Sequence, residues 1–106
     1  MRQICAGVVA VIFTSQRTAL DPAGYSAAAA EMDAAAAAMP GYLGVRTARD
    51  SDGFGITVSY WRDMGSAKAW RDDARHSEIR AEGKARWYSR YEVVVATVDR
   101  SYDWQA

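Results

Sequence analysis

YLGVRTARDSDGFGITVSYW, residues 42–61, is the stretch that decides the fold. Apolar and polar side chains alternate in both of its halves, which is typical of strands with two unlike faces. Between the halves lies Asp50-Ser51-Asp52-Gly53, where the glycine can adopt the positive φ of a tight hairpin turn. The stretch therefore predicts two antiparallel strands, residues 42–49 and 55–61, in the middle of the chain.

A helix is predicted before this hairpin. Asp21 can cap its first free amides, and Pro22 suits its first turn. Residues 27–38 are mostly alanine, the residue with the highest helix propensity, and Pro40-Gly41 ends the pattern. Because alanine is small, we expect this helix to lie close to the sheet that it covers.

Two shorter helical segments are predicted after the hairpin. Asp63 can cap the first of them, which extends to about residue 72. The pair Asp72-Asp73 interrupts the pattern, and the second segment covers about residues 75–86. We expect the interruption to re-aim the second segment relative to the first.

The outer strands are predicted at residues 4–13 and 88–98. The first reads ICAGVVAVIF, and the second is rich in tyrosine and valine. Both are apolar on two faces, which is typical of strands that are covered on both sides. Residues 99–106 follow as a tail.

The predicted order of elements is β-α-β-β-α-β. Right-handed crossovers turn this order into one ferredoxin-like α+β domain over residues 1–106, with a core of about 4–100 and a four-stranded antiparallel sheet. Both helical segments lie on one face of the sheet, and the other face would be a large apolar patch on a single chain. We therefore expect a homodimer that packs two open faces together. The Tyr102-Asp103-Trp104 tail would reach the partner or cover its own sheet.

Charge and cysteine content exclude several classes of protein. The chain has 13 basic and 13 acidic residues and no run of one sign, so nucleic acid and anionic membranes are not expected as partners. Residues 4–13 are too short to span a bilayer, and no small-residue cleavage pattern follows Phe13, so a cytoplasmic protein is predicted. The single cysteine, Cys5, allows no intrachain disulfide and is interpreted as a small buried residue.

The candidate site centres on His76, the only histidine. On a helix, His76, Arg80, Gly83 and Trp87 fall within about 100° of one another, and the missing side chain of Gly83 could leave a cavity. One interpretation is that His76 is a hydrogen-bonded inner-face residue that fixes the helix break. The other is that His76 and Trp70 are catalytic, with His76 exchanging protons with a substrate. The substrate pocket would then be lined by Tyr60, Arg80, Gly83 and Trp87.

Sequence motifs for common cofactors are not found. The chain contains no G-x-G-x-x-G, P-loop, G-x-S-x-G or H-E-x-x-H pattern. No second histidine or cysteine lies near enough to His76 in the sequence to share a metal ion. The sequence therefore predicts a protein that works without a bound nucleotide, metal or other cofactor, unless one arrives with the substrate.

Several segments occur in an order and spacing that carry a family resemblance: PGYLGV at 40–45, GITVSYW at 55–61, Ala69-Trp70, His76, and Gly83 followed by Arg86-Trp87-Tyr88. Together they resemble the antibiotic biosynthesis monooxygenase (ABM) domain family over roughly residues 4–100. The resemblance implies a dimeric α+β barrel. It also implies one of the family's activities, which include cofactor-independent oxidation of phenolic polyketides to quinones, quinol oxidation and heme degradation.

Three functions follow from the resemblance. The first is a cofactor-independent monooxygenase that acts on a small aromatic, phenolic or quinol-like compound in a pocket between the helices and the sheet. A phenolate or enolate of the substrate would react directly with O₂ in this dry aromatic pocket. The alternative is a non-catalytic dimeric module that binds a small molecule or acts as an accessory protein. Heme binding or degradation is third, because that branch relies on an Asn on the first strand and a His about ten residues after the Trp. Residues 4–13 contain no Asn, and the tenth residue after Trp70 is Arg80.

Overall fold

The computed structural model describes residues 4–106, apart from the side chains of residues 74 and 75. The elements follow one another as β1 Val9–Arg17, α1 Pro22–Ala37, β2 Tyr42–Arg49, β3 Phe54–Trp61, α2 Met64–Arg71, α3 Ala74–Glu82, a π-helical turn Gly83–Trp87, and β4 Tyr88–Thr97. This is the predicted β-α-β-β-α-β order, with the second helix divided where Asp72-Asp73 predicts a break.

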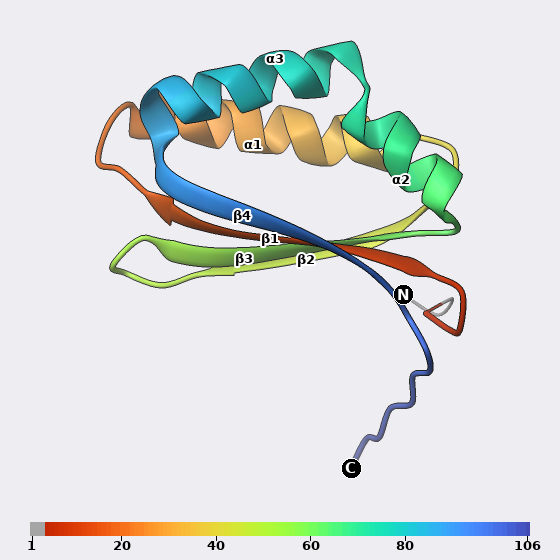
Figure 1. Cartoon of the computed structure of the whole chain (residues 1–106). Helices are drawn as coiled ribbons and strands as arrows, with labels where there is room; N and C mark the ends of the chain where they lie inside the picture. The colour runs from red at the N-terminus through yellow and green to blue at the C-terminus, as the bar shows by residue number, and fades with distance from the viewer. Residues whose placement is uncertain (1–3) are drawn as a thin grey trace.

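The four strands form one antiparallel sheet in the order β2-β3-β1-β4. All three α-helices lie on the same face of the sheet, and the other face is bare (Figure 1). The predicted ferredoxin-like α+β fold is therefore confirmed. The hairpin between β2 and β3 turns where expected, with Gly53 at a φ of 94°.

The first strand begins and ends later than predicted. Residues 4–8 do not join the sheet as a regular strand, because the chain turns there: the Val8 amide donates to the Cys5 carbonyl, and Gly7 has a φ of 93°. Pairing instead continues through polar residues up to Arg17, which is opposite Tyr88. Cys5 lies in the turn and is exposed, so the prediction that it is buried is wrong.

The core lies between the helices and the middle of the sheet. Val9 and Trp61 are buried on the helix side of neighbouring strands, where they are register partners. Ala36 of α1 packs into the same cluster, which confirms that alanine lets this helix lie close to the sheet. Ala67 and Trp70 of α2 complete the cluster.

The open face carries exposed apolar side chains. Strand register and alternation place Phe54 and Ile56 of β3 and Val94 of β4 on this face, and all three are exposed. On the helix side of β4, Val93 and Val95 are also 50 % exposed. The outer part of β4 is therefore covered on neither side within one chain, contrary to the expectation drawn from its apolar sequence.

Candidate functional site

The break between α2 and α3 places two aromatic rings against each other. Asp63 caps α2 by accepting the Ser66 amide at 2.8 Å. Asp73 caps α3 by accepting the amide of His76 at 2.9 Å. A side-chain acceptor at the start of each helix satisfies an amide that has no partner within the helix, which explains why the chain can end one helix and start another here.

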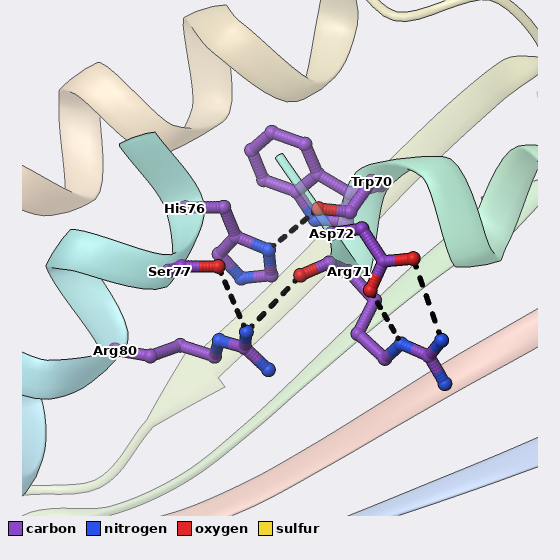
Figure 2. Close-up of polar contacts among 6 residues, drawn as sticks. All are labelled: Trp70, Arg71, Asp72, His76, Ser77 and Arg80. Carbon is purple, nitrogen blue, oxygen red and sulfur yellow. Dashed lines mark hydrogen bonds and ion pairs between the residues drawn. The ribbon is translucent and has the colours of Figure 1, made fainter. Parts of the chain in front are cut away.

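The His76 imidazole stacks on the indole of Trp70. The ring centroids are 4.2 Å apart, and the planes differ by 8°. His76 Nδ1 also lies 2.9 Å from the backbone carbonyl oxygen of Trp70 (Figure 2). A carbonyl oxygen can only accept, so Nδ1 carries the proton and donates. The neutral ring then has its lone pair on Nε2, which no hydrogen bond within the described part of the chain engages.

Burial lowers the pKa of His76 below its ordinary value near 6.5. The hydrogen bond to the Trp70 carbonyl opposes this effect, and the nearby positive charge of Arg80 adds to it. The net direction is downward, so the imidazole is neutral at pH 7. A neutral imidazole with a free Nε2 can accept a proton from a bound molecule.

Arg80 ties α3 to the end of α2. Its Nη2 donates to the Arg71 carbonyl at 3.1 Å and to Ser77 Oγ at 3.0 Å, and both bonds are visible in Figure 2. Beside it, Arg71 Nε and Asp72 Oδ1 form an exposed ion pair at 3.0 Å. These contacts hold the junction in the conformation that keeps His76 on Trp70.

A wall of aromatic rings stands behind the stack. Trp61 is fully buried, and its ring lies 6.1 Å from that of Trp70 at an angle of 23°. Tyr42 meets Trp61 edge-on at 5.7 Å, and Trp61 Nε1 donates to Ser59 Oγ at 2.9 Å. The sequence did not predict that Trp61 would lie behind the stack. Trp61, Thr57 and Ser59 alternate onto one face of the strand, and the structure shows that this face is the one covered by the helices.

The structure brings only part of the predicted set together. His76, Trp70 and Arg80 meet at the junction. Tyr60 does not, because it immediately precedes Trp61 in β3, and successive side chains of a strand point to opposite faces. It lies on the open face, away from the helices.

Gly83 and Trp87 belong to a different cluster. A Cβ on Gly83 would come within 3.0 Å of the Tyr88 ring, so the space that its missing side chain leaves is filled rather than hollow. Trp87 is buried and donates from Nε1 to Asp21 Oδ2 at 3.2 Å. Gly83 lies seven residues, or about two helical turns, beyond His76. The π-helical turn that begins at Gly83 has a wider spacing, which shifts Trp87 off the stripe that an α-helix would share with His76.

This second cluster contains a polar group that sequence reasoning also missed. Arg49 Nη2 donates to buried Ser15 Oγ at 2.9 Å and to the Tyr25 hydroxyl at 3.2 Å. The Arg17 guanidinium lies 4.0 Å above the Tyr25 ring. Burial, together with Tyr25, raises the pKa of Tyr88 far above its ordinary value, so Tyr88 stays protonated. Arg49 alternates onto the same face of its strand as Val45 and Thr47, and this alternation could have predicted that it points toward the helices.

Two hollows in the described structure lie away from the His76 stack. One, of about 310 Å³, is at the β2–β3 hairpin and is lined by Ala48, Arg49, Asp50, Phe54, Gly55 and Ile56. The other, of about 290 Å³, lies between α1, α3 and the π-helical turn, and its lining includes Ile79 and Trp87. On the helix side of β4, Val93 and Val95 leave an apolar surface open, and Val95 is the register partner of Val11, which packs against the cluster that contains Trp70.

The structure describes residues 4–106. Within that part of the chain, no group of three or more His, Cys, Asp or Glu side chains is arranged to hold a metal ion. None of the helices described there combines the length and the apolar character needed to cross a membrane.

Comparison with known proteins gives a consistent family and fold. A family model described as antibiotic biosynthesis monooxygenase matches residues 10–82. Protein YqjZ of Bacillus subtilis is 45% identical over 91 residues, which cover 86% of this chain and 79% of that protein.

Solved structures match over nearly the whole chain. SnoaB, a cofactor-independent oxygenase from Streptomyces nogalater, superposes with a TM-score of 0.77 at 16% identity, covering 91% of this chain and 97% of that one. Rv0793 from Mycobacterium tuberculosis gives a TM-score of 0.76 at 18% identity, with 90% and 99% covered. At these identities, the likeness establishes the shared fold.

Proposed function

Because the chain belongs to the antibiotic biosynthesis monooxygenase family, we propose that it is a cofactor-independent monooxygenase that acts on a small phenolic or quinol-like compound. The observation that carries this proposal is the bond from His76 Nδ1 to the Trp70 carbonyl, which leaves Nε2 as a neutral base. The SnoaB structure, which shares the fold, is of a cofactor-independent oxygenase.

The chemistry balances with the groups of this chain and O₂ alone. Nε2 accepts a proton from an activated CH₂ group next to a phenol ring, and the carbanion passes electrons to O₂ and forms a C–O bond. The peroxide anion takes the proton back from the His76 imidazolium. The resulting hydroperoxide loses water, so that R₂CH₂ and O₂ become R₂C=O and H₂O. Trp70 fixes the orientation of the base by stacking, and its carbonyl fixes the tautomer.

The substrate would lie between the stack and the helix side of β4. Val93 and Val95 offer a half-exposed apolar surface there, and Val11 of β1 shares that side of the sheet. Arg80 contributes a positive charge near the base, which favours an anionic form of the substrate. Within this proposal, His76 is the catalytic base, Trp70 its stacking partner and Arg80 a substrate-binding group.

A homodimer through the open sheet face is part of the proposal. Phe54, Ile56 and Val94 are exposed on that face in one chain, and a second copy of the sheet would cover them. The contact would be isologous, with each copy offering the same patch.

One observation favours a second function, a non-catalytic module that binds a small organic molecule. The two hollows described above are lined by neither His76 nor Trp70. Direct reaction of an anion with O₂ is best served by a site from which water is excluded, and the surface beside the stack is open along β4.

Oxygen uptake separates the two functions. Electron-rich tricyclic phenols that carry an activated CH₂ group are supplied to the purified protein, and O₂ consumption and quinone absorbance are followed together. We expect turnover that falls at least about 100-fold in His76→Gln, the usual contribution of a general base, and that is unchanged in Lys68→Gln, an exposed control on α2. Thermal stabilisation by a compound that causes no O₂ uptake would support the binding module instead. A Soret shift on mixing with hemin would point to heme.

A further inference from the structure

The segment after β4 leaves the sheet on its open side. From residue 98 onward no regular strand or helix is present, and Figure 1 shows this segment running away from the helices, beyond the bare face. Tyr102 and Trp104 are 88 % and 82 % exposed. Ser101 Oγ donates to the Ile4 carbonyl, which anchors the start of the segment. Two large aromatic side chains are thus held in solvent beside an apolar sheet face.

The hollow at the β2–β3 hairpin has an apolar lining that could bind an aromatic side chain. Ala48 and Ile56 are register partners on the open face, and with Phe54 they line a hollow of about 310 Å³. That volume is about ten times the share of one water molecule, roughly 30 Å³. An aromatic side chain would cover Phe54 and Ile56, which are exposed in a single chain.

The tail of the same chain does not fill this hollow. Val9 pairs with Thr97, whereas Gln16 pairs with Phe54, so the tail leaves the sheet at the end opposite to the hairpin. The separation is seven residue steps along β1, or roughly 23 Å. To reach the hollow, the tail would have to lie back along its own sheet, and the exposure of Tyr102 and Trp104 shows that it does not.

We propose that the tail is an arm that docks Trp104 into the hairpin hollow of a second copy of this chain. The proposal rests on the proposed homodimer. If the twofold axis runs across the strands, the partner's hairpin lies at the end of the sheet where the tail leaves, about two strands to the side of β4. Facing sheets are about 10 Å apart and neighbouring strands about 4.8 Å, so the hollow lies roughly 15 Å from the end of β4. The six residue steps from Val98 to Trp104 reach roughly 20 Å when extended.

The charges of the chain favour a twofold axis across the strands over one along them. The arm carries Asp99, Arg100 and Asp103, and the hairpin carries Arg46 on the open face and Asp50 in the lining of the hollow. Docking the arm at the hairpin therefore brings charges of both signs together from the two copies. An axis along the strands would instead bring two acidic arms together.

Disulfide trapping and sedimentation test the arm on the full chain. In a Cys5→Ser background, one preparation carries Trp104→Cys and the other Ile56→Cys. We expect a cross-linked pair in the mixture, well above the yield from either preparation alone. In the native background, Trp104→Ala should raise the dimer dissociation constant at least tenfold, whereas Gln105→Ala should not change it.

Two results would overturn the arm. One is an unchanged dimer dissociation constant in Trp104→Ala together with no cross-link in the mixture, which would leave the homodimer standing without it. The other is a wild-type chain that sediments as a monomer at micromolar concentration, which would remove the homodimer as well. Both readouts are independent of O₂ uptake, so they do not depend on whether the protein is an enzyme.

Discussion

The free energy of unfolding should fall as the pH is lowered below about 6.5, and His76 alone should cause that fall. Burial lowers the pKa of His76 in the folded chain, whereas the unfolded chain binds a proton with the ordinary value of 6.5. Between these two values the unfolded state carries the extra proton, so stability decreases as pH decreases. One proton sets an upper limit of about 1.4 kcal/mol per pH unit.

The sole histidine makes this prediction unusually clean. The pKa values of Asp21, Asp63 and Asp72 are lowered from an ordinary value of 3.8, so their stabilising effect is lost only as pH falls toward and below that value. Urea unfolding at several pH values between about 5 and 8 should show a slope in the wild type. His76→Gln should remove the slope, and Lys68→Gln, an exposed control on α2, should keep it.

Nitrogen NMR of the His76 ring checks the tautomer in the same samples. We expect a proton on Nδ1 and a lone pair on Nε2 at pH 7, because Nδ1 donates to the Trp70 carbonyl. If the stability of the wild type and of His76→Gln depended on pH in the same way, burial would not lower the pKa of His76. If the ring carried its proton on Nε2 alone, Nε2 could not act as the base.

Two further predictions concern the local structure. Gly83→Ala should destabilise the fold by roughly 1 kcal/mol in a thermal melt. Overpacking against Tyr88 costs about 1–3 kcal/mol, and the gain in helix propensity is at most about 1 kcal/mol. Gly65→Ala is the control: its Cβ would meet only Asp63 Oδ1 at 3.6 Å, so it should be neutral or stabilising in the same melt. Asp73→Ala should cost about 1 kcal/mol through the lost cap and lower any O₂ uptake, and Asp73→Asn should restore both if the cap is what positions His76.

The sequence predicts the elements that have strong local signals. Gly53 marks the hairpin, Asp63 starts α2, and Asp72-Asp73 marks the break between α2 and α3, each because a turn or cap has specific backbone chemistry. The first strand begins later than its apolar residues predict, because the chain turns at Gly7 before it enters the sheet. Polar residues up to Arg17 pair well enough in the sheet to extend it.

The candidate site was predictable in part. His76 and Trp70 come together as the helix break suggests, but the π-helical turn that separates them from Trp87 has no sequence signal in a single chain. Tyr60 is a different case. Alternation separates it from Trp61, but the sequence of one strand does not say which of its two faces the helices cover, and the structure places Trp61 on the helix side.

The helix break is what makes a base possible at this position. In a continuous helix, Trp70 and His76 would be about 240° apart around the axis, and the Trp70 carbonyl would accept the amide four residues later. Because α2 ends at Arg71, that carbonyl accepts the Asp73 amide at 3.2 Å in place of the amide four residues later, and the start of α3 turns His76 back over Trp70. The same carbonyl oxygen also accepts a hydrogen bond from the Nδ1–H of His76 at 2.9 Å. The break therefore sets both the position of the ring and its tautomer. A variant in which α2 and α3 form one continuous helix should lose the stacking of His76 on Trp70 and the Nδ1–H tautomer, although His76 is still present.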